Sequence, residues 1–370
     1  MKLNKIKLII FHPFSTIGGA DRSIARLIDG LDKKIYEIVF ITLKKPIIGK
    51  YLKSKIKIIN LNVSKTIFSI FKVRKILKKI QNNHKIIFFS NQNFANLISF
   101  LILIKFKNIK HVIIERNHID EFKYGANIIQ HIKKKIIKFL ITKIYKYADL
   151  VLGNAQQLSD DLSELTKINV SKIYNPAYDK SVFDLGNKKI NFNYFKKNIV
   201  LNIGRLEHQK DQITILKAIR DIEDINLIII GYGSLKKKLD SYIKNNKLKN
   251  RVKILENISN PYPYFKIADL FVLSSLYEGF PNVLTEAIMF NVPIISSNCN
   301  SGPKEILLQK RGAQLFQPRN YIELRTKIKA YFKNNMIIKK RDKILKKNLK
   351  NFDKKIIISE YNRLFLNLFR

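Results

Sequence analysis

The sequence predicts an α/β protein of two doubly wound domains, each built on a mostly parallel sheet. A chain of 370 residues is too long for one ordinary hydrophobic core. Short apolar runs alternate with longer amphipathic stretches, which is typical of strands joined by crossover helices. This alternation stops at Asn175-Pro176 and starts again near residue 198, so it indicates two domains rather than one.

Each short apolar run predicts one buried strand. The first domain has runs at residues 6–11, 35–41, 56–59, 85–89, 110–114 and 150–152. The second has runs at residues 198–203, 226–230, 251–255, 270–273 and 293–296. The domain boundaries follow from these runs: residues 1–175, a linker at 176–197, residues 198–350, and a C-terminal helix at 351–370 expected to pack back on the first domain. We expect the two domains to face a cleft and ligands to bind beyond the carboxyl ends of the strands.

The charge is strongly positive, with 70 Lys and Arg against 28 Asp and Glu and a formal net charge of +42. Such a field attracts nucleic acid, anionic lipid or phosphorylated substrates. A genome bias that enriches Lys, Ile and Asn together would also produce it. Because lysine far outnumbers arginine, and base recognition prefers arginine, we expect no specific nucleic-acid partner.

Cysteine usage and hydropathy bear on location. The single cysteine, Cys299, excludes an internal disulfide framework and suits a reducing compartment. The longest apolar run, at residues 97–104, is far shorter than the ~20 residues that span a bilayer, so we expect no transmembrane helix. The segment 128–147 mixes lysine with isoleucine. It could lie on an anionic membrane surface, or pack on the first sheet with its lysines in water. We expect a cytoplasmic protein that could associate with the inner face of the plasma membrane.

Three strand-end loops could contact an anion. Gly18 and Gly19 follow the first strand, and Gly231 follows a strand of the second domain. Glycines there allow close backbone approach, although a plain tight turn would also explain them. The loop after strand 198–203 begins at Gly204 and carries Arg205 and Lys210. Two cations in one loop suit a diphosphate, whose charge must be stabilised as it leaves.

The strongest pattern follows strand 270–273 and reads SSLYEGFPNVLTEA over residues 274–287. Gly279 permits close backbone approach, and Pro281 favours a helix start. Glu278 then lies in the loop and Glu286 about one turn into the helix. Two carboxylates so placed can accept hydrogen bonds from vicinal hydroxyls, as sugars and ribose present them, beside the amide groups of the helix start. A capped helix with two surface glutamates is the alternative.

These segments resemble glycosyltransferase family 4, whose members are retaining enzymes with the GT-B fold of two Rossmann-like domains. Residues 278–286 resemble its motif of two glutamates separated by seven residues, and residues 204–211 resemble its phosphate loop. Residues 291–296 and 301–307 (SGPKEIL) resemble its next strand and turn, in a form common in enzymes that build bacterial O-antigen, capsule or lipid-linked oligosaccharide. In the first domain the resemblance is limited to the Gly18-Gly19 turn and to residues 174–176.

The resemblance implies a role for each matched residue. Arg205 and Lys210 would hold the donor diphosphate, Glu286 the ribose hydroxyls, and Glu278 the donor hexose. His118 is the best candidate for a histidine near the donor sugar. The remaining donor-binding candidates are backbone groups and packing residues at strand ends and at the helix start: Gly18, Gly19, Gly204, Gly231, Phe280, Pro281, Asn282 and Val283.

The expected reaction moves a hexose or N-acetylhexosamine from a nucleotide diphosphate sugar, such as a UDP-sugar, to a glycan or lipid-linked glycan acceptor in cell-surface polysaccharide synthesis. We expect no cofactor and no metal, because no Asp-x-Asp motif ends a predicted strand. Two alternatives stay open on the same fold: a non-catalytic polyanion-binding protein and a UDP-sugar epimerase.

Overall fold

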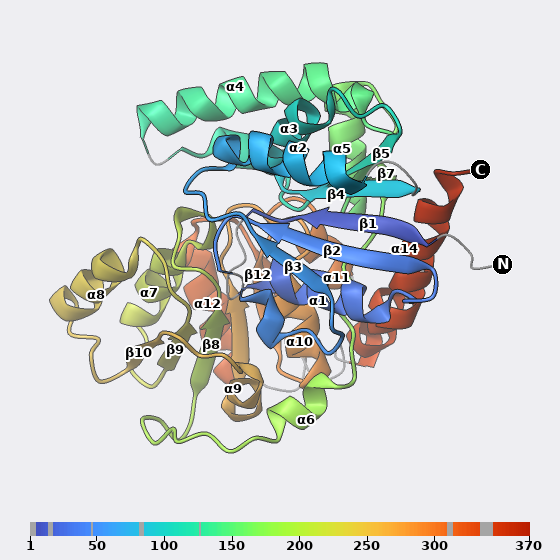
Figure 1. Cartoon of the computed structure of the whole chain (residues 1–370). Helices are drawn as coiled ribbons and strands as arrows, with labels where there is room; N and C mark the ends of the chain where they lie inside the picture. Colours follow the sequence, from blue (N-terminus) through green and yellow to red (C-terminus); the bar gives the residue numbers. More distant parts are fainter. Residues whose placement is uncertain are drawn as a thin grey trace. The chain divides into compact units, whose positions relative to one another are not determined.

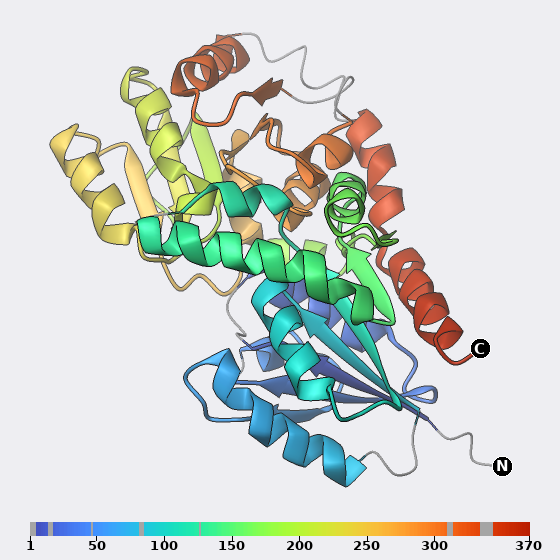
Figure 2. The ribbon, with the colours of Figure 1, turned by 90° about the horizontal axis from the view of Figure 1, so that it is seen from above.

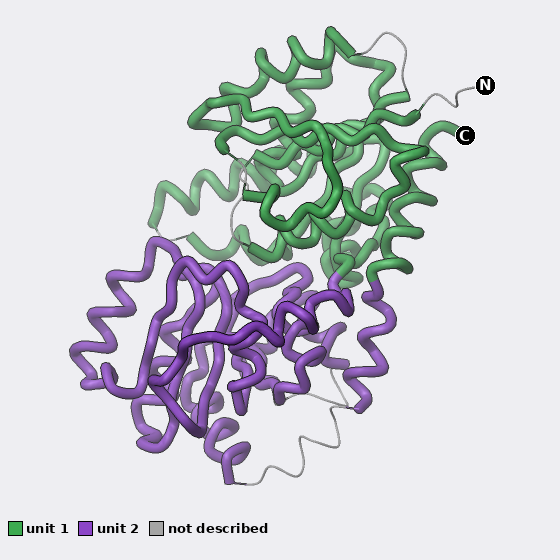
Figure 3. The backbone as a smooth tube through the Cα atoms, turned by 60° about the horizontal axis from the view of Figure 1, so that its bottom comes forward, with its two compact units in different colours: residues 1–176, 354–370 green, residues 177–353 purple. Residues whose placement is uncertain are grey.

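The computed structural model describes residues 5–13, 18–45, 47–80, 85–125, 127–308, 314–333 and 343–370. The chain forms two compact units (Figure 3). Unit 1 comprises Met1–Pro176 and Lys354–Arg370, and unit 2 comprises Ala177–Asp353.

Unit 1 is built on a parallel sheet whose described strands run in the order β3-β2-β1-β4-β5-β6-β7. The strands are β1 (Ile6–Phe11), β2 (Tyr36–Thr42), β3 (Lys57–Asn60), β4 (Ile86–Asn91), β5 (Ile109–Glu115), β6 (Leu150–Gly153) and β7 (Ser171–Lys172). The helices are α1 (Gly19–Gly30), α2 (Ser69–Ile80), α3 (Asn93–Leu103), α4 (Ile128–Ile144), α5 (Gln156–Thr166) and α14 (Lys354–Asn367) (Figure 1).

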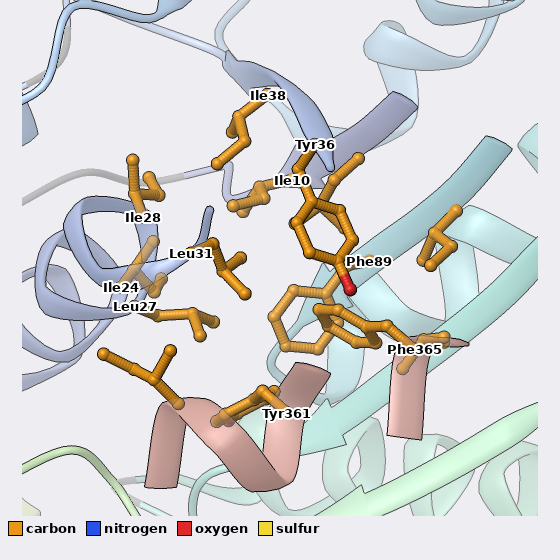
Figure 4. Close-up of a cluster of buried hydrophobic side chains, with 14 of the residues drawn as sticks. Ile10, Ile24, Leu27, Ile28, Leu31, Tyr36, Ile38, Phe89, Tyr361 and Phe365 are labelled. Carbon is orange, nitrogen blue, oxygen red and sulfur yellow. The ribbon is translucent and has the colours of Figure 1, made fainter. Parts of the chain in front are cut away.

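Helices cover both faces of this sheet, because successive strand residues point to opposite sides. In β1, Ile10 packs with residues of α1 and α14, whereas its neighbour Ile9 packs with residues of α2 and α3. Figure 4 shows the first of these cores, where Tyr361 and Phe365 of α14 lie beside Phe89 of β4. The C-terminal helix therefore supplies part of the core of unit 1 although it follows unit 2 in the sequence.

Unit 2 is built on a second parallel sheet, whose described strands run in the order β10-β9-β8-β11-β12-β13. The strands are β8 (Ile199–Ile203), β9 (Asn226–Ile230), β10 (Val252–Leu255), β11 (Leu270–Leu273), β12 (Ile294–Ser297) and β13 (Gln314–Phe316). The helices are α6 (Val182–Gly186), α7 (Gln212–Arg220), α8 (Lys236–Asn245), α9 (Tyr262–Ile267), α10 (Asn282–Met289), α11 (Gly302–Ile306) and α12 (Tyr321–Lys333).

Both faces of the second sheet are also covered. Val200 and Val272 pack with residues of α7, α8 and α12. On the other side Phe265 of α9 stacks on Phe290, which follows α10, and contacts Phe271 of β11. The prediction of two doubly wound α/β units is therefore confirmed.

All eleven predicted strands are present, and their boundaries shift by at most two residues. The sequence reading missed β7 and β13. They contain two and three residues and lie at sheet edges, so they are too short to show an apolar pattern. The predicted linker at 176–197 belongs to unit 2 from Ala177 onward and contains α6. Among the described residues, no helix is both long and apolar enough to cross a membrane.

A buried polar network lies behind β5 in unit 1. The carboxyl of Glu115 accepts hydrogen bonds from the Tyr145 hydroxyl and, at 2.9 Å, from Asn96 Nδ2. Nε2 of His111 lies 2.6 Å from the Ser99 hydroxyl oxygen. Burial raises the pKa of Glu115 to about 8 and lowers the pKa of His111 to about 3. Both side chains are therefore uncharged in the folded protein at neutral pH.

These two pKa shifts predict how stability depends on pH. Glu115 keeps its proton in the folded state while the unfolded chain loses it near 4.5, so its stabilisation is lost as pH rises toward 8. His111 stays neutral in the folded state while the unfolded chain gains a proton below 6.5, so its stabilisation is lost as pH falls toward 3. Between pH 4.5 and 6.5 the two slopes oppose each other, and from pH 6.5 to 8 only Glu115 acts.

Glu115→Gln should abolish the contribution of Glu115 to the loss of stability above pH 6.5. The difference in the free energy of unfolding between the variant and the parent should therefore change by about 2 kcal/mol in favour of the variant from pH 6.5 to pH 8. Each pH unit over which one extra proton is bound is worth about 1.4 kcal/mol. Urea denaturation at several pH values measures this. Glu164→Gln, at an exposed position of α5, is the control and should show no such trend. A constant difference for Glu115→Gln across this range would contradict the prediction.

Candidate active site

The chain order of the unit 2 strands reverses between β8 and β11, which are neighbours in the sheet. Loops that leave two such strands turn to opposite faces and open a crevice at the carboxyl ends, where doubly wound sheets bind ligands. The loop after β8 holds residues 204–211, and the loop after β11 holds residues 274–281. The two segments with the strongest sequence patterns are therefore adjacent at this switch point.

An ion pair joins the two loops: Lys210 Nζ contacts Glu278 Oε1, and the Ser275 hydroxyl donates a 2.6 Å hydrogen bond to the same oxygen. The Lys210 and Glu278 side chains are only 16% and 7% exposed. Removing one member of such a pair leaves a buried charge without its counter-ion. The pair thus places a fixed cation and a fixed carboxylate side by side at the crevice.

Gln209 makes three hydrogen bonds, and two of them join the same two loops. Its side-chain oxygen lies 3.3 Å from Arg205 Nη2, its Nε2 donates to the carbonyl of Tyr277 at 2.9 Å, and its carbonyl accepts from the Leu276 amide at 2.8 Å. Arg205 itself is exposed, so its guanidinium is oriented but remains in water. The sequence reading gave Gln209 no role. The available signal was an amide between His208 and Lys210, in the loop that follows a predicted strand.

Glu286 lies within α10, whereas Glu278 of the ion pair lies in the loop before this helix. Glu286 is fully buried, and the hydroxyl of Tyr262 lies 3.4 Å from its Oε1. Pro281 is the N-cap residue of α10 and Asn282 its first residue, so the positive end of this helix points into the loop that carries Glu278. Phe280, Pro281 and Asn282 are buried and Val283 is half-buried. A carboxylate on each side of a helix start is the arrangement that the sequence predicted.

Gly231 and Gly204 allow two strand-end loops to touch. A Cβ added to Gly231 would lie 1.9 Å from the carbonyl oxygen of Gly204, which no relaxation of a side chain could relieve. The amide of Gly204 donates to Ile230 O at 3.0 Å, and the amide of Leu206 donates to Tyr232 O at 2.8 Å. Gly231 therefore fixes the path of the loop that carries Arg205.

Gly231→Ala should destabilise unit 2 and displace the Arg205 loop, because the added methyl group meets backbone. Overpacking of this kind costs about 1–3 kcal/mol, and a backbone contact falls at the upper end. Chemical denaturation measures the loss. Gly49→Ala is a matched control, since a Cβ there meets nothing within 4 Å. Equal stability of the two variants would contradict the close contact of Gly231 with the carbonyl oxygen of Gly204.

A third loop, after β12, supports the loop of Glu278. The amide of Gly302 donates a 2.7 Å hydrogen bond to Gly279 O, and a Cβ at Gly302 would lie 2.1 Å from that oxygen. Ser301 has a φ of 83°, a backbone conformation that costs a non-glycine residue about 1–3 kcal/mol.

Cys299, in the same loop after β12, is buried. Burial raises the pKa of its thiol to about 12, and the charge of Glu278 adds to this shift. This thiol is therefore protonated at neutral pH.

Gly18, Gly19 and His118 belong to unit 1, whereas the other predicted site residues belong to unit 2. Gly18 is the N-cap residue of α1 and Gly19 its first residue, at the carboxyl end of the sheet. His118 follows β5 and is buried. Its Nε2 lies 2.6 Å from Asp161 Oδ2, and its Nδ1 accepts from the Asp120 amide at 3.2 Å. In this arrangement His118 anchors the segment after β5 to α5, and its contact with a donor sugar stays a prediction.

The sequence reading missed Arg116 as a site candidate. This buried guanidinium follows β5 and donates to Asn91 Oδ1 from Nε and Nη2 at 3.0 and 2.9 Å, and from Nη1 to Asn175 Oδ1 at 3.0 Å. Desolvation lowers its pKa, and the carboxylate of Asp21 at the start of α1 opposes this shift. Asn91, which ends β4, and Asn175, which follows β7, therefore orient one cation at the carboxyl edge of the unit 1 sheet. An arginine directly after a strand was the signal.

Within the described ranges, no group of three or more His, Cys, Asp and Glu side chains is placed to hold a metal ion.

Solved structures share this architecture over nearly the whole chain. Sucrose-phosphate synthase from Thermosynechococcus elongatus superposes with a TM-score of 0.82 at 16% identity, and 99% of each chain is covered. The Anabaena protein HepE, in complex with UDP and glucose, gives a TM-score of 0.79 at 15% identity over 98% of this chain and 99% of that one. Together with the two parallel sheets, these likenesses establish the GT-B fold.

Two family models match the sequence. Residues 17–177 match Glycosyltransferase Family 4, and residues 186–352 match Glycosyl transferases group 1. An uncharacterised glycosyltransferase of Methanocaldococcus jannaschii is 33% identical over 297 residues, which cover 74% of this chain and 72% of that protein. A 4-alpha-N-acetylgalactosaminyltransferase of Campylobacter jejuni, named for a diacetylbacillosaminyl-diphospho-undecaprenol substrate, is 26% identical over 94% of this chain and 96% of its own.

The fold and the sequence matches therefore define a glycosyltransferase. The chain belongs to glycosyltransferase family 4, as the segments 204–211 and 274–287 predicted.

Proposed function

We propose that the protein transfers a hexose or N-acetylhexosamine from a UDP-sugar to a glycan or lipid-linked glycan in cell-surface polysaccharide synthesis. The observation that carries this proposal is the Lys210–Glu278 pair across the switch point of unit 2, with Arg205 in the same loop. The names of two relatives support the acceptor, since both Campylobacter jejuni enzymes are named for undecaprenol-linked glycans. Two complexes support the donor: that of HepE with UDP-glucose, and that of S. aureus TarM with UDP, a structure similar to this chain with a TM-score of 0.74 at 13% identity.

Lys210 and Arg205 would hold the diphosphate of the donor. As the bond between the anomeric carbon and the phosphate oxygen breaks, negative charge grows on the diphosphate, and two fixed cations stabilise that charge more than they stabilise the ground state. The acceptor hydroxyl forms the new bond to the anomeric carbon on the same face, and its proton passes to the departing phosphate oxygen. Transfer would then proceed with retention and without a divalent metal, because the cations of the protein neutralise the leaving group.

Glu278 and Glu286 would divide the donor between them. Glu278 is held by Lys210 and Ser275 beside the diphosphate, so its remaining carboxylate oxygen is available to a hydroxyl of the hexose. Glu286 lies about one turn into α10, where it would accept hydrogen bonds from the ribose. Gly18 and Gly19, at the start of α1, stay candidates for contact with the phosphates. Residues near Arg116 would face the acceptor.

We place the reaction in the cytoplasm, at the inner face of the plasma membrane, where a nucleotide sugar and a lipid-linked acceptor can meet. The buried, protonated thiol of Cys299 is compatible with a reducing compartment.

The test is a transfer assay with UDP-, GDP- and ADP-sugars and an undecaprenyl-diphosphate-linked glycan. NMR of the product reads the anomeric configuration, and a parallel reaction contains EDTA. Transfer from one UDP-sugar with retention, unaffected by EDTA, is the expected result. Inversion at the anomeric carbon would contradict the mechanism, and complete loss in EDTA that Mn²⁺ restores would contradict metal independence. Conversion of the free UDP-sugar into its epimer without transfer would favour an epimerase.

A further inference from the structure

One face of α4 exposes large apolar side chains. Ile128 and Ile129 are each 73% exposed, Ile132 and Ile136 slightly more than half, and Phe139 60%. Ile128, Ile132, Ile136 and Phe139 are spaced by four, four and three residues, so they form one stripe along the helix. We call these five side chains the α4 apolar face.

This face is opposite the side by which α4 packs on unit 1. Ile141 is buried, and Ile137 packs in the same cluster with residues of β5, β6 and α5. At about 100° per residue, Ile137 and Ile141 project roughly 130° and 170° away from the middle of the apolar face. Figures 1 and 2 show α4 on the outside of unit 1, over the layer that contains α3. The helix is thus apolar on its packed side and again on its exposed side.

The charged residues of the segment that carries this face are all lysines. Residues 128–147 contain no Asp or Glu and six lysines, at positions 133, 134, 135, 138, 143 and 146. Lys134 is held inward by the carbonyls of Glu121 and Tyr124. Lys143 Nζ lies 5.7 Å from the centre of the Phe139 ring, and Lys146 Nζ lies 5.1 Å from that of Tyr147. Long cationic side chains beside exposed apolar ones are typical of helices that lie in a membrane interface.

We propose that the α4 apolar face inserts into the headgroup and acyl boundary of an anionic bilayer. The lysines determine this choice of partner. A protein surface would have to neutralise the five lysines of this segment that are exposed, whereas anionic lipid supplies negative charge at any spacing. Electrostatic attraction alone would not hold the protein on the membrane, since salt screens the lysines. Apolar insertion alone would not hold it either, since the stripe is only three turns long. The proposal deepens the proposed function, because a lipid-linked acceptor would be reached from this surface, but it rests on α4 alone.

The chain contains no tryptophan, so one introduced tryptophan reports its own surroundings. Phe139→Trp places it on the α4 apolar face. Ile356→Trp is the matched control: Ile356 of α14 is 50% exposed, and α14 packs on the opposite face of the sheet. Vesicles of phosphatidylglycerol and phosphatidylcholine, with and without brominated acyl chains, are added to each variant. The emission of Phe139→Trp should shift to shorter wavelength and be quenched by the brominated lipid, while that of Ile356→Trp should not change.

Flotation with the same vesicles tests each force separately in the full-length protein. Ile132→Ser/Ile136→Ser/Phe139→Ser should reduce the bound fraction about tenfold at every salt concentration. Lys133→Gln/Lys135→Gln/Lys138→Gln should reduce it at low salt and leave little salt dependence. Lys354→Gln/Lys355→Gln/Ile356→Ser is the control on α14 and should bind like the parent.

Equal quenching of Phe139→Trp and Ile356→Trp, or no quenching of either, would overturn the proposal. A dimer in light scattering that the triple serine variant converts to monomer, without vesicle binding, would assign the face to a second copy instead. Calorimetry with UDP on the triple serine variant separates the two proposals. Normal UDP binding with lost flotation supports docking through α4, whereas insertion without any UDP binding would leave the docking proposal standing and count against the proposed donor.

Discussion

Replacing Lys210 by methionine is expected to lower kcat about 10²–10³-fold, the usual effect of losing one fixed donor to a developing negative charge. Methionine keeps most of the volume and removes the cation. The effect should appear in kcat as well as in kcat/KM, because the charge on the diphosphate is larger in the transition state than in the bound donor. Initial rates over a range of UDP-sugar concentrations measure both constants.

A second variant separates chemistry from folding at this site. Lys210→Met leaves Glu278 buried without its counter-ion, so it should also lower the Tm. Lys210→Met/Glu278→Gln removes both charges and should recover most of the Tm while turnover stays low. Lys327→Met, in the surface ion pair of Lys327 with Glu323 on α12, is the matched control and should change neither. Turnover that recovers together with the Tm in the double variant would show that Lys210 serves the fold and not the leaving group.

The two glutamates should lose different parts of the reaction. Glu278→Gln keeps the oxygen that accepts from Ser275 and removes the charge. It should leave the affinity for free UDP nearly unchanged and lower kcat about 10²-fold or more, since only the hexose loses its partner. Glu286→Gln should weaken UDP and UDP-sugar alike by about tenfold, because both ligands contain the ribose and a hydrogen bond to a charged group is worth about 1.5–3 kcal/mol.

Calorimetry with UDP and initial rates on the same preparations distinguish these roles. Glu164→Gln on α5 serves as the carboxylate control, since Glu164 is exposed and distant in sequence from every site segment. An equal loss of UDP affinity in Glu278→Gln and Glu286→Gln would refute the division between sugar and ribose. Normal transfer by both variants would contradict the proposed site as a whole.

The candidate site residues were easier to find from the sequence in unit 2 than in unit 1. In unit 2 the site segments are continuous in sequence, each begins at the end of a strand, and each has a pattern of its own, so Arg205, Lys210, Glu278 and Glu286 could be named in advance. In unit 1 the polar groups near β5 come from separate strands. Arg116 depends on Asn91 and Asn175, which lie 25 and 59 residues away. No local pattern links three such residues.

The sequence by itself determined the alternation of strands and helices, because burial on both faces of a parallel sheet requires continuous apolar runs, and those runs are local. It also determined the strand-end loops that carry the cations and carboxylates. Only the tertiary structure decided which loops meet. The sheet order places β8 beside β11, although 66 residues (204–269) separate the two strands in the sequence, and so joins Lys210 to Glu278. The tertiary structure also decided that the α4 apolar face points outward and that α14 completes the core of unit 1. Pairing between distant segments depends on the register and packing of the whole chain, which no single segment specifies.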